Sequence, residues 1–342
     1  MTRPVLDALF LLVPFVVYYR RNDLFKPQPK LEAYTMRHFL TLAELTPEQM
    51  QALLDLAVRI KSAWKAGEDT PYLKNKVLGM IFQKPSLRTR VSFDVAMLQL
   101  GGNALYLSPD EIQLGKRESV ADVARVISRY VNVVMARVFG HADVVSLAKD
   151  ATVPVINGLS DYSHPCQGMA DFLTILEHKG SFKGKKLVYL GDGNNVATSL
   201  LYGATLLRMN FTLAAPKGYG LHPAIWDMGR RLAVQSGSTI EAVDDPMLAV
   251  QDADVIYTDT WTSMGQEAEA EQRRKLFPPY RVDDAKLARA KSDVIVMHCL
   301  PAHRGEEITD AVADGPHSVL FDQAENRLHA QKAILVWVLE KD

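Results

Sequence analysis

Short apolar segments alternate with amphipathic segments along most of this chain, and the alternation limits the folds that it can adopt. Segments rich in β-branched residues are predicted strands: Val77–Phe82, Val131–Val138, Val153–Ile156, Lys186–Leu190, Phe211–Ala214, Asp254–Tyr257 and Asp293–Met297. Between them, apolar residues recur at helical spacing in Val91–Leu100, Val120–Tyr130, Gln167–His178 and Asn195–Met209. Such alternation predicts an α/β protein with parallel sheets that helices cover on both faces.

The length of 342 residues fits two domains, because a domain commonly has about 150 residues. We expect one domain over residues 36–166, a second over residues 167–322, and a C-terminal helix over residues 323–342 that returns to the first. Ligands of parallel sheets bind beyond the carboxyl ends of the strands, and small-molecule sites favour the cleft between two domains. The polar residues that follow the strands are therefore the candidates for a site.

Residues 1–35 do not continue this pattern. The apolar run Val5–Tyr19 contains Asp7 and Pro14 and is shorter than the roughly 17–25 residues that span a bilayer. No cleavage site typical of a signal peptide follows it. We expect an upstream extension outside the fold, with Met36 as a second plausible start and no membrane partner. A peripheral membrane segment and an export signal are the alternatives.

Charge and cysteine content argue against several classes of function. Lysine and arginine number 39 against 40 aspartates and glutamates, so the chain has no basic field to bind nucleic acid. The cysteines, Cys166 and Cys299, are too few for a disulfide framework and favour a reducing cytoplasm. His298 and His303 flank Cys299, but no further Cys-His cluster completes a zinc site. We therefore expect no metal.

The strand Val77–Phe82 is followed by Ser86-Leu87-Arg88-Thr89-Arg90, where a helix should begin. Helix N-termini bind phosphate through free N–H groups, and arginine adds forked, charged hydrogen bonds. The segment predicts a phosphate site, and a capped helix with solvated arginines is the equal alternative.

Polar residues also follow the next two strands. Arg137 ends an apolar strand, where a charge is costly without a buried partner or a ligand. His164 and Gln167 lie three residues apart at a predicted helix start, so both can donate to a carbonyl oxygen on which negative charge builds. Taken alone, His164 would fit a capping or core histidine better.

The turn Gly191-Asp192-Gly193-Asn194-Asn195 has some features of a dinucleotide fingerprint. Val196 replaces the third glycine, however, and Ala215 stands where an acidic residue should bind a ribose. We therefore expect no nicotinamide cofactor. Asn194 and Asn195 could bind a carboxylate and an ammonium, or they could be ordinary turn residues.

The segment from Thr258 to Gly265 opens a polar connection that is long for this fold and is a candidate lid. Within it, Asp259 supplies an anion for an ammonium group. Cys299, at a strand end, is either an inert buried thiol or a polar contact to an amine.

Together these motifs resemble the aspartate/ornithine carbamoyltransferase family over residues 36–342. Ser86-Leu87-Arg88-Thr89-Arg90 and His164-Pro165-Cys166-Gln167 look like the family's carbamoyl-phosphate signatures. Ser263-Met264-Gly265, which follows Asp259, and His298-Cys299-Leu300-Pro301 are similar to the ornithine branch. Two positions depart from the usual motifs: Leu87 replaces a threonine, and Cys166 replaces a threonine or isoleucine.

The resemblance implies carbamoyl transfer from carbamoyl phosphate to the δ-amine of L-ornithine, giving citrulline and phosphate. It implies a role in arginine metabolism, no cofactor, and a homotrimer with shared active sites. Alternatives are another amine acceptor, such as putrescine or an acylated ornithine, or a non-catalytic amino-acid-binding homologue.

The resemblance also assigns residues. Around carbamoyl phosphate it places Ser86, Leu87, Arg88, Thr89, Gln113 from a neighbouring subunit, Arg137, His164, Gln167, Cys299, Leu300 and Arg327. Around ornithine it places Asn195, Asp259, Ser263 and Met264. The expected catalytic residues are Arg137 and His164, which stabilise the oxyanion, and Asp259 and Cys299, which position and deprotonate the amine.

Overall fold

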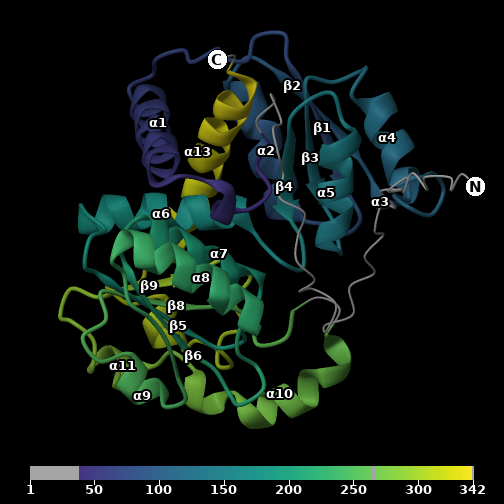
Figure 1. Cartoon of the computed structure of the whole chain (residues 1–342). Helices are drawn as coiled ribbons and strands as arrows, with labels where there is room; N and C mark the ends of the chain where they lie inside the picture. The colour runs from purple at the N-terminus through teal and green to yellow at the C-terminus, as the bar shows by residue number, and fades with distance from the viewer. Residues whose placement is uncertain (1–37, 264–265, 341–342) are drawn as a thin grey trace, which may run out of the picture.

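The computed structural model describes residues 38–263 and 266–340, which form two halves that are each built on a parallel sheet (Figure 1). This arrangement confirms the predicted α/β class. The predicted extension over residues 1–35 lies outside the described residues. Within the described part of the chain, every helix is too short or too polar to cross a membrane.

The first half contains a four-stranded sheet of order β2-β1-β3-β4. Its strands are β1 (Val77–Phe82), β2 (Asn103–Leu107), β3 (Val133–Arg137) and β4 (Val155–Leu159). Its helices are η1 (Leu42–Glu44), α1 (Pro47–Lys65), α2 (Leu87–Gln99), α3 (Pro109–Ile112), α4 (Val120–Ile127) and α5 (His141–Asp150). Since all pairings are parallel, the carboxyl ends of the strands lie at one edge.

The second half contains a five-stranded parallel sheet of order β7-β6-β5-β8-β9. Its strands are β5 (Lys186–Leu190), β6 (Asn210–Ala214), β7 (Ile240–Val243), β8 (Val255–Thr258) and β9 (Ile295–His298). Its helices are α7 (Asn195–Leu206), α8 (Pro223–Ser236), α9 (Pro246–Ala249), η2 (Glu267–Glu269), α10 (Ala270–Leu276), η3 (Pro278–Tyr280), α11 (Asp284–Leu287) and α12 (Asp310–Ala313).

The predicted strands recur with small shifts, but the sequence pattern missed β2 and β7. Both are edge strands whose residues are exposed or only partly buried, so neither is a continuous apolar run. The strand predicted at Val153–Ile156 begins at Val155 and continues to Leu159. The second half of β4 contains Asn157 and Gly158. Because these residue types are uncommon in strands, the sequence pattern placed the end of the strand too early.

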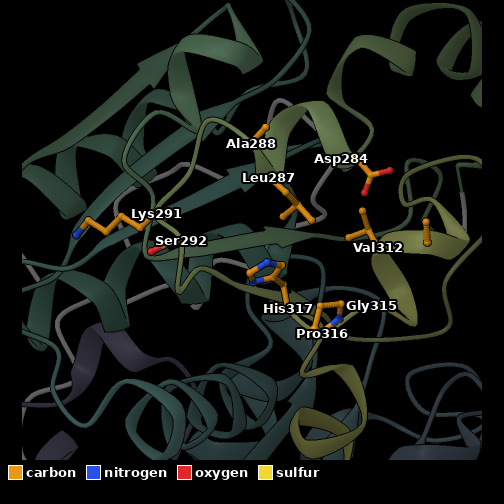
Figure 2. A pocket seen from close by; sticks show the side chains of 10 residues that line it. Asp284, Leu287, Ala288, Lys291, Ser292, Val312, Gly315, Pro316 and His317 are labelled. Atoms are coloured by element: carbon orange, nitrogen blue, oxygen red, sulfur yellow. The ribbon is translucent and has the colours of Figure 1, made fainter.

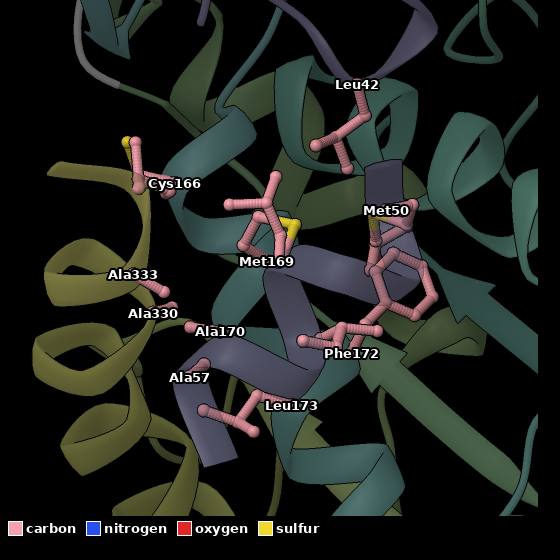
Figure 3. Close-up of a cluster of buried hydrophobic side chains, with 14 of the residues drawn as sticks. Leu42, Met50, Ala57, Cys166, Met169, Ala170, Phe172, Leu173, Ala330 and Ala333 are labelled. Atoms are coloured by element: carbon pink, nitrogen blue, oxygen red, sulfur yellow. The ribbon is translucent and has the colours of Figure 1, made fainter. Parts of the chain in front are cut away.

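Two helices connect the halves. α6 (Pro165–Lys179) follows β4, and α13 (Leu320–Leu339) runs back beside α6, α1 and α2 (Figure 1). The small residues Ala57, Ala170, Ala330 and Ala333 lie where α1, α6 and α13 approach, with Cys166 beside α13 (Figure 3). Small side chains allow close helix contact, so α13 packs closely against α1 and α6 in the interior.

Local signals explain where two of these helices begin and end. Thr46 caps α1 through a capping box with Gln49, and Pro47 occupies the first helical position. Gly180, the C-cap residue of α6, adopts a left-handed conformation with φ of 69°, which favours glycine. Gly180 therefore ends α6 after Lys179. The first turn of α6, at the other end of the helix, follows the carboxyl end of β4.

Candidate active site

The site begins where β1 passes into α2. Ser86 is the N-cap residue of α2, yet its hydroxyl makes no bond to the helix backbone and instead donates to Thr89 Oγ1 at 3.0 Å. Leu87 and Arg88 are exposed. The start of α2 therefore departs from an ordinary capped helix. The alternative of a capped helix with solvated arginines fits the exposed Arg88 and Arg90, but it does not fit the missing Ser86 cap.

Two buried guanidiniums converge on Thr89. Arg327 Nη2, from α13, donates to Thr89 Oγ1 at 2.9 Å, and Arg137 Nη1, at the end of β3, lies 3.4 Å from the same oxygen. Neither arginine forms an ion pair with a carboxylate of the described residues, and the Nε of each has no hydrogen-bond partner there. Because a buried charge is costly without a counter-charge, this arrangement favours an anionic ligand.

The same burial changes the protonation of these groups. Burial, and then repulsion from Arg327, lowers the pKa of Arg137 to about 10. Burial, and then Arg327 and Arg137, keeps the pKa of His164 well below its usual value. His164 is thus a neutral imidazole whose Nδ1 has no partner among the described residues, and its side chain does not cap α6. The capping interpretation therefore does not fit.

Gln167 lies on the first turn of α6 and is held by a carboxylate. Its Nε2 donates to Asp171 Oδ1 at 2.8 Å, which leaves Oε1 buried and without a partner among the described residues. Its Nε2 keeps a second N–H, so the donation to a carbonyl oxygen stays a prediction, whereas the atom without a partner is an acceptor.

In the second half, Asp259 follows β8 and accepts hydrogen bonds. Cys299 Sγ donates to Asp259 Oδ1 at 3.0 Å, and Asn194 Nδ2 donates to Oδ2 at 2.8 Å. Asn194 also caps α7 through Oδ1, so the turn-residue alternative is partly right. Asn195 Nδ2 donates to Ser160 O of the first half at 2.6 Å. Asn194 and Asp259 therefore bond to each other, whereas Asn195 links α7 to the first half.

Burial, and then the adjacent Asp259, raises the pKa of Cys299 well above its usual value. Cys299 is therefore a thiol that donates to Asp259, not a thiolate nucleophile. Cys299 also interacts electrostatically with Arg137 and Arg327. The polar residues of the two halves therefore belong to one site.

His298 holds the segment that carries Cys299 and Leu300. Its Nδ1 accepts from Leu300 N at 2.9 Å, and its Nε2 lies 3.0 Å from the buried Glu307 Oε1. Both ring nitrogens are thus engaged, so a metal ion at His298 would have to displace one of these bonds. His303, Glu306 and Glu307 lie close enough together to bind a metal ion, but Glu306 already forms an ion pair with Arg274 Nε at 3.0 Å.

Some predicted residues make no contact with the site residues described above. Gln113 is exposed at the end of α3, where its side chain bonds to Asp110 O of its own turn at 3.3 Å. Ser263 N donates to Gln266 Oε1 at 3.2 Å, within its own loop. Met264 lies outside the described residues.

Two polar groups of this region were missed by sequence reasoning. Asp171 is a carboxylate within the apolar helix α6, which is the signal that could have found it. Arg273, fully buried in α10, pairs with Asp192 at 2.9 Å and donates to Trp261 O at 2.7 Å. Arg273 therefore ties the segment after Asp259 to the turn that follows β5.

A separate hollow of about 330 Å³ lies on the second half (Figure 2). Its lining comes from Asp284, Leu287, Ala288, Lys291, Ser292, Ala311, Val312, Gly315, Pro316 and His317. The Lys291 side chain points away from the other lining side chains and pairs with Asp254 at 2.9 Å. His317 Nδ1 is engaged with Val294 O at 2.8 Å. None of the convergent groups described above lines this hollow.

Comparisons with known proteins agree with this geometry. The family model described as "Aspartate/ornithine carbamoyltransferase, carbamoyl-P binding domain" matches residues 37–177, and the one described as "Asp/Orn binding domain" of the same family matches residues 183–338. The chain belongs to the aspartate/ornithine carbamoyltransferase family. The first match contains Thr89, Arg137 and His164, and the second contains Asp259 and Cys299.

Relatives within the carbamoyltransferase family are similar over nearly their whole length. An ornithine carbamoyltransferase of Thermococcus kodakarensis is 55% identical over 303 residues, which cover 89% of this chain and 96% of the relative. The solved ornithine carbamoyltransferase of Pyrococcus furiosus is 56% identical with a TM-score of 0.86, covering 87% of this chain and 96% of that one. A solved N-acetyl-L-ornithine transcarbamylase variant is 33% identical, with a TM-score of 0.79, covering 89% of this chain and 100% of that one.

Proposed function

We propose that this protein transfers the carbamoyl group of carbamoyl phosphate to the δ-amine of L-ornithine, giving L-citrulline and phosphate. The observation that carries the proposal is the convergence of Arg137 and Arg327 on Thr89 without a carboxylate, beside the neutral His164. The 55% identity to ornithine carbamoyltransferases supports ornithine as the acceptor, whereas the acetylornithine enzyme is only 33% identical.

On the donor side, the two guanidiniums and the start of α2 are suited to a phosphate dianion. Arg88, exposed on the first turn of α2, is placed to add a further charge as the leaving phosphate departs. The unpaired Nε of Arg137 and the imidazole of His164 can donate to the carbonyl oxygen, which becomes negative in the tetrahedral intermediate. The Leu87 backbone N–H remains available although the usual hydroxyl is missing.

On the acceptor side, the amine must lose a proton before it attacks, since an alkylammonium has a pKa near 10.4. Asp259 would hold the ammonium, with Asn195, Ser263 and Met264 around the rest of ornithine. The Cys299 thiol would stay close to the reacting nitrogen. The Asp259 carboxylate takes the proton that the ammonium loses before attack. The amine nitrogen then bonds to the carbonyl carbon, the carbon–oxygen bond to phosphate breaks, and the departing phosphate accepts the second proton of the nitrogen.

We also propose a homotrimer in which Gln113 completes the site of a neighbouring subunit. Val91 and Leu98 lie seven residues apart on α2 and are 50% and 72% exposed, and Leu105 on the edge strand β2 is 49% exposed. Apolar side chains on one helix face beside an open sheet edge are typical of an interface. Light scattering that gives the mass of a monomer at micromolar concentration would contradict this assembly.

The free thiols Cys166 and Cys299 support a cytoplasmic location for the enzyme, where thiols stay reduced. Cys166 is fully buried, as expected for a packing position in the His-Pro-x-Gln motif.

A colorimetric assay of ureido product tests the function directly. The purified chain would be given carbamoyl phosphate with ornithine, aspartate, N-acetylornithine or putrescine at equal concentrations. We expect product with ornithine at a rate at least about tenfold above any other amine, which corresponds to about 1.4 kcal/mol of discrimination. Faster reaction with putrescine or N-acetylornithine would replace the acceptor, and no product with any amine would reject the function.

A further inference from the structure

A network of buried hydrogen bonds lies behind Gln167. Asp171, four residues further along α6, is fully buried and accepts from three side chains. Its Oδ1 accepts from Gln167 Nε2 at 2.8 Å and from Gln323 Nε2 at 2.7 Å, and its Oδ2 accepts from Tyr257 OH at 3.2 Å. The three donors come from α6, α13 and β8, so the network spans both halves of the molecule.

The direction of each bond in this network is fixed. Gln323 Oε1 already accepts from the backbone N–H of His298 at 2.8 Å, so only its Nε2 is left for Asp171 and for Tyr257 OH at 3.0 Å. Since Tyr257 receives that N–H, its own hydroxyl proton points to Asp171. Asp171 is consequently an acceptor toward all three neighbours, and Gln167 must turn its amide nitrogen to it.

Gln167 Oε1 therefore points the other way, where it is buried and has no partner among the residues that the structure describes. His164, the N-cap residue three positions earlier, likewise has an imidazole Nδ1 that is buried and without a partner among the described residues. An unpaired buried acceptor favours a ligand that donates an N–H. A phosphate dianion and a carbonyl oxygen cannot donate, but the amide nitrogen of a carbamoyl group can.

We propose that Asp171 is a positioning residue that fixes the orientation of the Gln167 amide, so that the site selects a donor with a carbamoyl N–H over an acyl phosphate without one. The inference rests on the proposed carbamoyl transfer and extends it to the choice between acyl donors. Asp171 does not touch the substrate and acts through Gln167.

The choice of a carboxylate at this position supports the inference. An asparagine could present either its oxygen or its nitrogen to Gln167 and would leave both orientations possible, whereas a carboxylate excludes one of them. Burial raises the pKa of Asp171 to about 7, and the three donors oppose that shift. A buried acid is costly, and such groups gather at functional sites.

Two non-hydrolysable probes separate selection from catalysis. Phosphonoacetamide carries the carbamoyl N–H groups, and acetonylphosphonate has a methyl group in their place. Calorimetric titration of the full-length protein with each probe gives the ratio of their dissociation constants. We expect the wild type to prefer phosphonoacetamide by about tenfold, as for one buried hydrogen bond. We expect Asp171→Leu to reduce the ratio to about one, because Gln167 is then free to turn.

The matched control is Thr174→Val, on the same buried face of α6. The Thr174 hydroxyl bonds to Ala170 O at 2.8 Å and to Asn326 at 2.9 Å, away from Gln167. This variant disturbs helix packing without touching the network, so it should keep the tenfold ratio. Loss of the ratio in Thr174→Val would overturn the proposal, since a general packing defect would then suffice.

A second pair of variants retains the test if Asp171→Leu does not fold. Gln167→Glu places an acceptor against Asp171, and adding Asp171→Asn restores one N–H between the two residues. We expect the double variant to bind phosphonoacetamide about tenfold more tightly than Gln167→Glu alone. Equal binding by the two would overturn the role of Asp171.

The outcomes separate this inference from the proposed function. Wild-type protein that binds both probes equally, or Asp171→Leu that keeps the wild-type ratio, would overturn the positioning role and leave carbamoyl transfer intact. Wild-type protein that binds neither probe would overturn both.

Discussion

The two halves of the site differ in how their polar groups are paired. In the first half, Arg137, Arg327, His164 and Gln167 each keep a buried atom without a hydrogen-bond partner among the described residues. In the second half, Asp259 already accepts from Cys299 and Asn194. The first half is therefore organised for a ligand in advance, whereas ornithine must replace bonds that the protein makes to itself. Preorganised donors stabilise a transition state without a cost of rearrangement.

This difference predicts that changes in the first half lower turnover and that changes in the second half mainly weaken ornithine binding. The largest effect is expected for Arg137→Met, which removes a donor to the oxyanion. We expect kcat to fall by about 10²–10³-fold, as is typical for one lost donor of this kind. Initial rates of citrulline formation at saturating substrates would measure it. Arg125→Met, which breaks an exposed ion pair to Asp150, is the matched control and should keep kcat within about twofold.

A smaller effect is expected for Asp259→Asn, which removes the charge that would pair with the ammonium. A hydrogen bond to a charged group contributes about 1.5–3 kcal/mol, so kcat/KM for ornithine should fall by about 10–100-fold. The KM for carbamoyl phosphate should hardly change. Asp227→Asn, in an exposed ion pair with Arg230, is the control for loss of one negative charge. If the KM for carbamoyl phosphate rose as much as that for ornithine, the two halves would not act separately.

The contrast between the halves also shows what the sequence can predict. Ser86, Thr89, Arg137 and His164 follow strands of a regular α/β pattern, so the residues themselves and the edge at which they gather were predictable. Arg327 was assigned only through the family resemblance, because it lies on the last helix. A C-terminal helix that returns to the first half was expected, but nothing in the local pattern says that it brings Arg327 to Thr89 at the start of α2.

The pairing of these residues was not predictable. That Gln167 turns its nitrogen to Asp171 depends on Gln323 and Tyr257, which are distant in sequence and meet only through packing. The edge strands β2 and β7 were missed for a related reason, since their half-exposed pattern lacks the apolar run of a central strand. Sequence periodicity reports burial, but hydrogen-bond partners are set by the tertiary structure.

A third prediction concerns the link between the halves. His141 Nδ1 bonds to Ser160 Oγ at 2.8 Å, and Ser160 O receives the Asn195 amide from the second half. Burial lowers the pKa of His141 to about 4, from a usual value of 6.5. The unfolded chain therefore takes up a proton below pH 6.5 that the folded chain refuses, so the stabilising effect of His141 is present above pH 6.5 and is lost as the pH falls toward 4.

We expect this effect to reach roughly 2 kcal/mol at pH 5, from the difference between the two pKa values. The free energy of unfolding by urea would be measured for the wild type and for His141→Asn at pH 7.5 and pH 5. The advantage of the wild type should shrink by this amount at the lower pH. A constant difference between the two proteins would mean that His141 is protonated at pH 5 in the folded protein, as it is in the unfolded chain. Solvent would then reach the imidazole in the folded state.

The smallest effect is expected at Cys299, where the second half meets the arginines of the first. If the thiol serves as a donor to Asp259, Cys299→Ser should retain most activity, because a hydroxyl can make the same bond. Cys299→Ala should lose about three- to tenfold in kcat/KM for ornithine, because a thiol is only a weak hydrogen-bond donor to the Asp259 carboxylate. Because burial and Asp259 raise the pKa of this thiol, iodoacetamide should alkylate it slowly at pH 8. Rapid alkylation, or a serine variant as poor as the alanine variant, would instead indicate a thiolate with a direct role in proton transfer. Cys299 would then not be a donor to Asp259, and the second half would not be paired with itself at this residue.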